Sequence, residues 1–285
     1  MRGVFRTENY EIRYERSART RYPIFLIPPF PGSEYVYKPL IKELLKDNPK
    51  ADFVNFTLPG LGGRNKLFTL KNLKTFDYAV IVSDFIRSFN PNSYSIIATS
   101  FGGYIAGVAL SKKLIEPRKL ILISPIINSR KLFSRSLKFQ RFLLLAAYKM
   151  GFTKKIMLLV NNIYIWLVEA RKWRKTKTYK NASRAIKEFE TLDVDESIFI
   201  FDEIAKRNSI DLEKWKKRIL LTVGDRDNPD IIEDCQKMEK KGFILKWVVG
   251  GTHGYIFWDP EQLSKILLPF LFEENWFKFI PCSSL

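Results

Sequence analysis

The stretch Tyr94–Gly103, YSIIATSFGG, decides how this chain is interpreted. Its first half is aromatic and β-branched, which favours a strand, and small residues lie on both sides of Ser100. Small neighbours permit a sharp turn in which the serine backbone is strained and its hydroxyl stands clear of a sheet. We therefore predict a strand, a tight turn that carries Ser100, and a helix that begins at Phe101.

A serine displayed in this way indicates acyl transfer through a covalent serine intermediate. The usual pattern is G-x-S-x-G, and Ala98 takes the place of its first glycine here. A serine in a strand–glycine–helix turn can also be structurally idle. A catalytic interpretation therefore requires a base, and an acid that orients the base, elsewhere in the chain.

The composition is that of a globular protein with a large core. Of 285 residues, 46% are hydrophobic and 14% aromatic, which excludes a disordered or low-complexity chain. The net charge is +18, but basic and acidic residues are interspersed, so we interpret the excess as solvated surface. It leaves open an anionic substrate or peripheral contact with an anionic membrane, whereas nucleic acid is not expected.

Cysteine usage and the first residues indicate a cytoplasmic location. Cys235 and Cys282 lie far apart and predict neither a disulfide framework nor a metal site. The chain becomes charged within its first eight residues, so we expect no signal peptide. The apolar stretch Ile156–Val168 is too short to span a bilayer and contains two asparagines.

Short apolar segments alternate with segments of helical spacing. Strands are expected at 10–15, 24–27, 53–56, immediately before Ser100, and at 120–123, 219–223 and 245–249; helices are expected at 34–46, 75–89, from 101, and at 230–241 and 259–272. This alternation predicts an α/β protein with a mostly parallel sheet flanked by helices. Region 128–210 breaks the alternation with basic, amphipathic stretches, and predicts a helical insertion.

The candidate base and acid follow the last two predicted strands. His253, in a glycine-rich loop, is the only histidine of the chain and hence the only imidazole base. Asp225, Asp227 and Asp230 follow the preceding strand. Asp230 comes after Pro229 at a predicted helix start, where we expect it to cap the helix or interact with the helix dipole. Asp225 and Asp227 then remain as candidate acids.

Several motifs in one order resemble the α/β-hydrolase superfamily, in particular its lidded serine hydrolases: esterases, proline iminopeptidases and C–C hydrolases. Ile24–Ser33 looks like the strand and loop that supply one oxyanion donor, and Leu58–Arg64 like the Pro-Gly-x-Gly-x-Ser turn. Gly224–Asp227 matches the Gly-x-x-Asp acid loop, which selects Asp227. The resemblance implies an α/β-hydrolase core over 1–127 and 211–285, with an inserted helical cap, or lid, over 128–210.

The resemblance also implies a function and a site. It implies a serine hydrolase that cleaves a carboxylic ester or related acyl compound through an acyl-enzyme, with a triad of Ser100, His253 and Asp227 and no cofactor or metal. The backbone N–H groups of Phe30 and Phe101 would form the oxyanion hole. Haloalkane dehalogenases and epoxide hydrolases of this superfamily use aspartate as nucleophile, so Ser100 argues against both.

Other functions stay open at this point. Within the fold they are an aminopeptidase, a thioesterase and a C–C bond hydrolase. A different class is a catalytically silent, basic binding module for nucleic acid or anionic membrane. The small-molecule acyl substrate would be apolar or anionic, because Leu144, Leu158, Ile163 and Trp166 of the insertion could line a pocket, and the run Arg171–Lys177 is basic. For any one of these residues, however, ordinary packing of the cap helices is the favoured interpretation, and for the basic run a solvated surface is.

Two departures from the family pattern concern loops near the site. Pro28-Pro29 stands where relatives have His-Gly, and Asn65 stands where serine is common. Proline has no backbone N–H to donate, but Phe30 directly after the pair still has one. The Pro-Pro pair could therefore either hold the loop rigid or shift its donor out of place.

Overall fold

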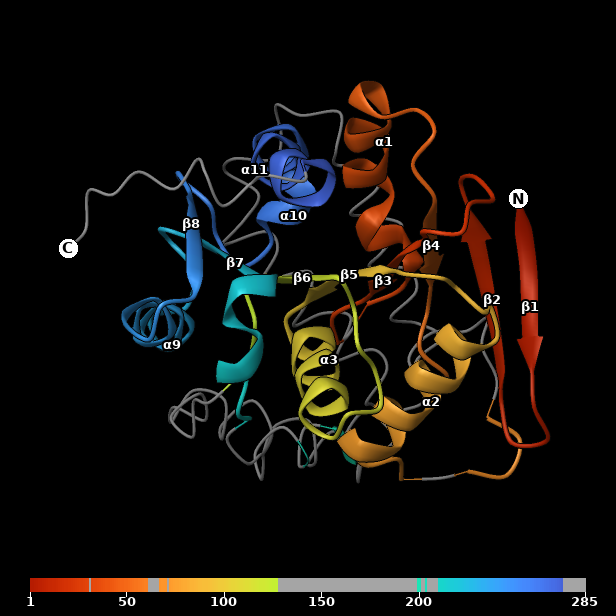
Figure 1. Ribbon diagram of the computed structural model, residues 1–285. Helices are drawn as coiled ribbons and strands as arrows, with labels where there is room; N and C mark the ends of the chain where they lie inside the picture. The colour runs from red at the N-terminus through yellow and green to blue at the C-terminus, as the bar shows by residue number, and fades with distance from the viewer. Residues whose placement is uncertain are drawn as a thin grey trace, which may run out of the picture.

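The computed structural model describes residues 1–30, 32–60, 67–70, 72–127, 199–200, 203 and 210–273. These residues form one eight-stranded sheet with the strand order β1-β2-β4-β3-β5-β6-β7-β8 (Figure 1). Its strands are β1 Arg2–Arg6, β2 Glu11–Arg16, β3 Ile24–Ile27, β4 Phe53–Phe56, β5 Ser95–Thr99, β6 Lys119–Ile123, β7 Ile219–Gly224 and β8 Ile244–Val248. β1 pairs antiparallel with β2, and β2 pairs antiparallel with β4. The strands β4, β3, β5, β6, β7 and β8 are parallel to one another, which confirms the predicted sheet.

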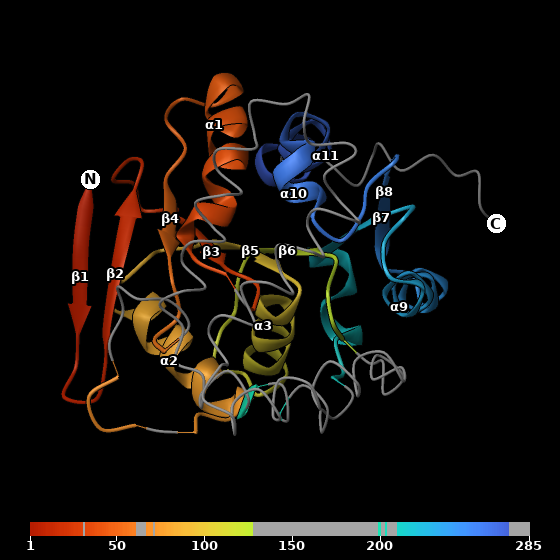
Figure 2. The ribbon, with the colours of Figure 1, turned by 180° about the vertical axis from the view of Figure 1, so that it is seen from behind.

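Helices cover both faces of the sheet. They are η1 Glu34–Tyr37, α1 Lys38–Asp47, α2 Thr75–Arg87, α3 Phe101–Ser111, η4 Glu213–Arg218, α9 Pro229–Lys240, α10 Tyr255–Trp258 and α11 Pro260–Phe272. α1, α10 and α11 pack on one face, and α2, α3 and α9 on the other (Figures 1 and 2). None of the helices in the described ranges is long and apolar enough to cross a membrane.

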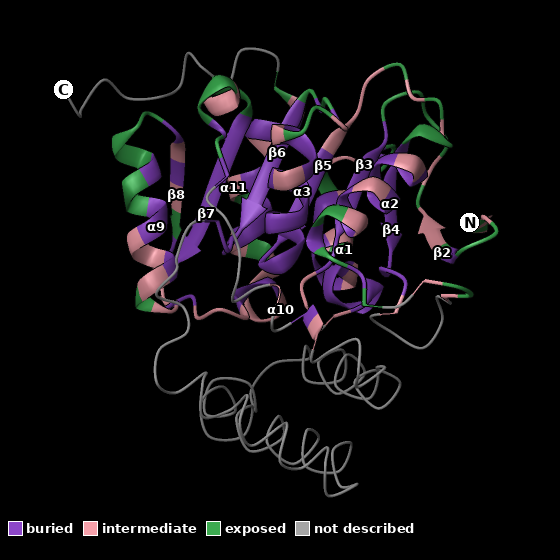
Figure 3. Cartoon of the chain, turned by 90° about the horizontal axis from the view of Figure 1, so that it is seen from below, coloured by how far each residue is buried: buried purple, intermediate pink, exposed green. Residues whose placement is uncertain are grey.

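Burial on both faces explains why the central strands are apolar throughout. Every residue of β3, β4, β6 and β7 is buried, as Figure 3 shows for the strands between the helix layers. Successive side chains point to opposite faces, so Phe25 and Ile27 join the core under α2 and α3 while Ile24 and Leu26 join the core under α1. Such strands hold the loops at their carboxyl ends in fixed positions.

The elements differ from the sequence prediction in four places: β1, η4 and α10 were not predicted, and one expected helix is divided. β1 was not predicted, because its five residues RGVFR are mostly charged or small, and only Gly3 and Phe5 are partly buried. The expected helix at 34–46 is divided into η1 and α1, with Pro39 in the first turn of α1. The predicted cap at 128–210 lies almost wholly outside the described residues.

Candidate active site

Ser100 lies between β5 and α3 in a left-handed backbone conformation. Its φ is +53°, which is unusual for a residue other than glycine. Ser100 is buried, with 3% of its surface exposed. Two neighbours on the adjacent β6 side hold the turn: Ser100 N donates to Ile123 O at 2.9 Å, and Ile126 N donates to Ser100 O at 3.4 Å. The strained turn predicted from Tyr94–Gly103 is therefore present.

Gly102 brings the loop after β3 against the first turn of α3. A Cβ on Gly102 would lie 2.4 Å from Pro28 O and 2.5 Å from Ile27 O, closer than atoms can approach. The rings of Phe30 and Phe101 meet edge to face, with centroids 6.2 Å apart. The two residues proposed as oxyanion donors thus lie side by side, and Phe101 N–H belongs to the first helical turn, whose amides lack acceptors within the helix.

A buried tyrosine fixes the strand that leads into the Pro28-Pro29 loop. The Tyr37 hydroxyl donates to Ile27 O at 2.6 Å and lies 2.9 Å from Thr99 Oγ1. Ile27 immediately precedes the proline pair and Thr99 immediately precedes Ser100. The Tyr37 side chain therefore links the ends of β3 and β5 and holds the Pro28-Pro29 loop next to the turn that carries Ser100.

His253 links Ser100 to Asp227. Its Nε2 lies 3.2 Å from Ser100 Oγ, and its Nδ1 lies 2.9 Å from Asp227 Oδ1. The Asp227 side chain is fully buried, whereas that of His253 is 38% exposed. The three side chains thus form one continuous hydrogen-bonded chain from a buried carboxylate to a serine hydroxyl.

The loops that carry Asp227 and His253 touch through backbone atoms. A Cβ on Gly224 would lie 2.1 Å from Gly251 O, so this contact requires glycine. Arg226 N also donates to Gly251 O at 2.9 Å, and Asp225 N donates to Val248 O at 3.2 Å. The contact between the loops fixes the distance between acid and base.

The three candidate aspartates have different surroundings. Asp227 faces His253, whereas Asp225 is exposed. Asp230 is in the first turn of α9, as expected for a residue that interacts with the helix dipole, but the capping side chain is Asn228, whose Oδ1 accepts from Asp230 N at 2.9 Å.

Asp227 is held in its charged form. Burial would raise its pKa, but the charge of His253 and hydrogen bonds from His253, Ser124 and Asn228 N lower it below the ordinary value of 3.8. The sequence interpretation missed Ser124, which donates to Asp227 Oδ2. A serine directly after a buried parallel strand, next to the strand that carries the acid, was the signal that would have found it.

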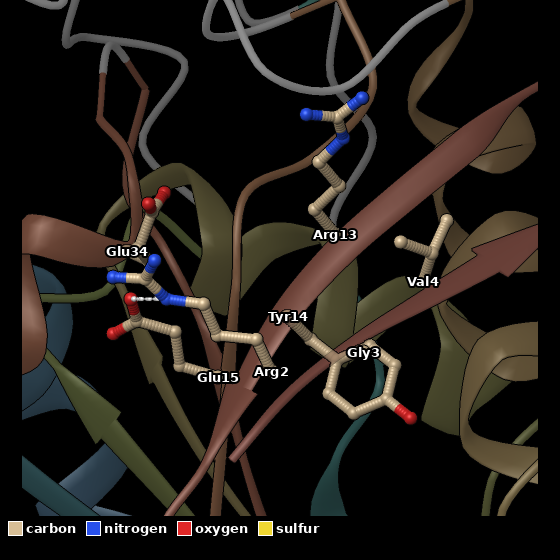
Figure 4. Close-up of a pocket in the computed structure, with 7 residues that line it drawn as sticks. All are labelled: Arg2, Gly3, Val4, Arg13, Tyr14, Glu15 and Glu34. Carbon is tan, nitrogen blue, oxygen red and sulfur yellow. Dashed lines mark hydrogen bonds and ion pairs between the residues drawn. The ribbon is translucent and has the colours of Figure 1, made fainter.

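Other candidate sites are limited. The described residues hold no cluster of three or more His, Cys, Asp or Glu side chains that would bind a metal ion. The pocket candidates Leu144, Leu158, Ile163 and Trp166 and the basic run Arg171–Lys177 lie outside the described residues. A hollow of about 440 Å³ at the β1–β2 edge is lined by Arg2, Gly3, Val4, Arg13, Tyr14, Glu15 and Glu34 (Figure 4). It contains none of the predicted site residues.

Solved structures of low sequence identity share this fold. A structure from work on carboxylesterases of Nitrososphaera gargenis aligns with a TM-score of 0.76 at 18% identity, covering 94% of this chain and 97% of that one. A hydrolase from Pseudomonas aeruginosa gives 0.73 at 13% identity over 95% and 98% of the two chains. A thermophilic esterase from Thermogutta terrifontis gives 0.70 at 15% identity, again over 95% and 98%.

The chain therefore has the α/β-hydrolase fold, as its motifs predicted. At these identities the similarity concerns the fold. No protein-family model matches the sequence, and no curated protein matches it either.

Proposed function

We propose that the protein is a serine hydrolase that cleaves a carboxylic ester, or a related acyl compound, through an acyl-enzyme. The observation that carries this proposal is the chain Ser100 Oγ–His253–Asp227, with separations of 3.2 and 2.9 Å. A nucleophile in hydrogen-bond reach of a base, and a base oriented by a buried acid, is the arrangement that activates a serine.

Each residue has a defined role in the proposed reaction. His253 Nε2 takes the proton of Ser100 as Oγ attacks the acyl carbon, and Asp227 stabilises the resulting imidazolium. The N–H groups of Phe30 and Phe101 stabilise the oxyanion. His253 then gives its proton to the leaving group and later takes one from the water that hydrolyses the acyl-enzyme.

The ester is the first choice among acyl substrates. Two of the structures with this fold come from work on esterases, and the partly buried ring of Phe30 lies on Phe101 beside the turn that carries Ser100. A hydrolysis screen of esters graded by chain length, with thioesters and aminoacyl amides in parallel, separates the esterase from the thioesterase and aminopeptidase. A vinylogous diketone substrate in the same screen tests for C–C bond cleavage.

Stoichiometric labelling by a fluorophosphonate tests the nucleophile. We expect the wild type to be labelled at Ser100, and Ser100→Ala to remain unlabelled although it folds. Asp225→Asn is the matched control, because Asp225 lies in the acid loop but is exposed; its labelling rate should equal that of the wild type. A wild type that is neither labelled nor active on any ester in the screen contradicts the proposal.

The same experiment distinguishes the silent binding module. Such a module would stay unlabelled and would bind DNA or anionic vesicles with an affinity that falls steeply with salt. The cytoplasmic location remains a prediction from cysteine usage, and cell fractionation with an antibody to the chain would test it.

A further inference from the structure

Both oxygens of the Asp227 carboxylate are hydrogen-bonded. Oδ1 accepts from Asn228 N at 2.6 Å and lies 2.9 Å from His253 Nδ1. Oδ2 accepts from the hydroxyl of Ser124, which comes from a different strand. Asn228 follows Asp227 directly in the chain, so Ser124 is the partner that fixes the carboxylate from across the sheet.

Ser124 lies directly after β6 in a conformation that aims its side chain at the acid. Its φ is +44°, and it is fully buried. Its N–H donates to Thr222 O at 2.9 Å, which ties it to β7, the strand that leads into the acid loop. A left-handed serine costs backbone energy that glycine would avoid, so a role for the hydroxyl explains why serine fits this position.

A second layer of hydroxyl groups lies behind Ser124. Tyr255 Oη lies 2.7 Å from Thr222 Oγ1, and the backbone of Thr222 accepts from Ser124 N. Tyr255 is fully buried at the start of α10, two residues after His253. Ser124 is therefore held beside the acid by β7, and Thr222 connects it to Tyr255, which begins the helix after the loop of His253.

We propose that Ser124 is a positioning residue, whose hydroxyl orients Asp227 and keeps it ionised so that His253 can act as base. The proposal rests on the proposed serine hydrolase function. Ser124 donates its proton to Oδ2, and Oδ1 is then directed at His253 Nδ1. Without the hydroxyl, the buried Oδ2 would lack this partner, and the carboxylate would be oriented only through Oδ1.

The other titratable groups near Asp227 do not replace Ser124. Cys235 on α9 and Tyr255 on α10 interact electrostatically with the carboxylate, and burial raises the pKa of both, so they remain neutral. Asp225 and Arg226 of the same loop are exposed. His253 is thus the cation that faces Asp227 when it takes up a proton, and Ser124 supplies a hydrogen bond at every pH.

Glycine and alanine at position 124 separate the hydroxyl from the backbone. Both Ser124→Gly and Ser124→Ala remove the hydrogen bond, but only glycine also relieves the left-handed backbone. We expect both variants to react with the fluorophosphonate roughly 10- to 100-fold more slowly than the wild type, the loss typical of a hydrogen bond to a charged group. We expect Ser124→Gly to keep a melting temperature close to that of the wild type.

The pH profile of labelling provides a readout that packing alone would not change. Loss of the Ser124 hydrogen bond destabilises the ionised carboxylate, so the Asp227–His253 pair holds its proton more tightly. The acid limb of the profile should therefore move to higher pH in both variants. Ser83→Ala is the matched control, because Ser83 is also buried and its hydroxyl donates to Leu114 O at 2.8 Å, in a contact formed by α2.

The outcomes separate this proposal from the proposed function. If the wild type is not labelled, the serine hydrolase assignment fails. If the wild type is labelled and Ser124→Gly reacts at the same rate with the same pH profile, the positioning role of Ser124 is wrong. A loss seen only in Ser124→Ala, in proportion to its melting temperature, would likewise overturn it in favour of backbone strain.

Discussion

The ends of β5 and β6 each carry a serine with a positive φ angle. Ser100 and Ser124 follow neighbouring parallel strands, both are buried, and their φ values are +53° and +44°. Ser100 Oγ faces an imidazole nitrogen, whereas Ser124 Oγ faces a carboxylate. A strained serine after a strand is therefore not enough to identify a nucleophile, because the group that faces its hydroxyl decides what the serine can do.

The residue that follows each serine is a second difference between the two turns. After Ser100 the chain enters α3 through Phe101 and Gly102, so the serine lies at a helix N-terminus beside the loop after β3. After Ser124 comes Pro125, which has no N–H to offer an oxyanion. The end of β5 thus combines a hydroxyl with an available amide, and the end of β6 supplies only the hydroxyl.

The largest predicted effect is at the end of β5. Ser100→Ala should lower kcat on a cleaved ester by about 10⁶, because the covalent path is lost. Ser124→Ala, with the same atom removed from the neighbouring turn, should lose only the 10- to 100-fold expected for a positioning hydrogen bond. Steady-state kinetics on both variants measures the contrast, and equal losses would mean that the two serines do not differ in role.

The next largest effect is predicted for Asp227, the carboxylate that both His253 and Ser124 contact. Asp227→Asn should lower kcat by roughly 10⁴, because an amide neither stabilises the imidazolium nor fixes the ring tautomer. Asp225→Asn should leave kcat unchanged, since Asp225 is exposed in the same loop. If the two variants exchange behaviour in the ester assay, the acid of the reaction is Asp225 and not Asp227.

A smaller effect distinguishes two adjacent glycines of α3. A Cβ on Gly102 would meet the backbone of Ile27 and Pro28 at 2.5 and 2.4 Å, whereas one on Gly103 would meet Pro125 Cβ at 3.3 Å. Gly102→Ala should displace the Pro28-Pro29 loop and cost ~10²–10³ in kcat, the value of one oxyanion donor. Gly103→Ala should cost much less, and equal kcat values would place the oxyanion donor elsewhere.

The smallest predicted effect is on the pH dependence of the free energy of unfolding. The lowered pKa of Asp227 means that it stabilises the folded protein above its unfolded pKa of 3.8, and that this contribution is lost as pH falls through the lower folded value. The stability advantage of the wild type over Asp227→Asn should therefore shrink from about pH 7 to about pH 3. Urea unfolding across that range measures it, and a constant difference would contradict the lowered pKa.

Much of the fold was predictable because its strands are buried on both faces. Runs such as Ile24–Ile27 and Leu120–Ile123 are apolar throughout, and the alternation with helices indicated a parallel sheet. β1 was missed because an edge strand buries few side chains and so carries a weak pattern. The division of 34–46 into η1 and α1 depends on local hydrogen bonds that spacing does not reveal.

For the candidate site, the single histidine and the serine turn left few choices, so Ser100 and His253 were selected from the sequence. Asp227 was preferred to Asp225 only through a family resemblance, because both follow the same strand. Ser124 and Tyr37 were missed, since each acts across the sheet on residues more than 50 positions away or on a backbone carbonyl.

The sequence by itself determined the layered α/β architecture, the strained turn at Ser100 and the candidate base, because these depend on local residue patterns and on a count of histidines. Only the tertiary structure decided which aspartate faces His253 and which serine lies beside which partner. The physical reason is that parallel strands bring their carboxyl ends together at one edge. Contacts there, such as Gly224 against Gly251 and Gly102 against Pro28, form between loops that are distant in the sequence.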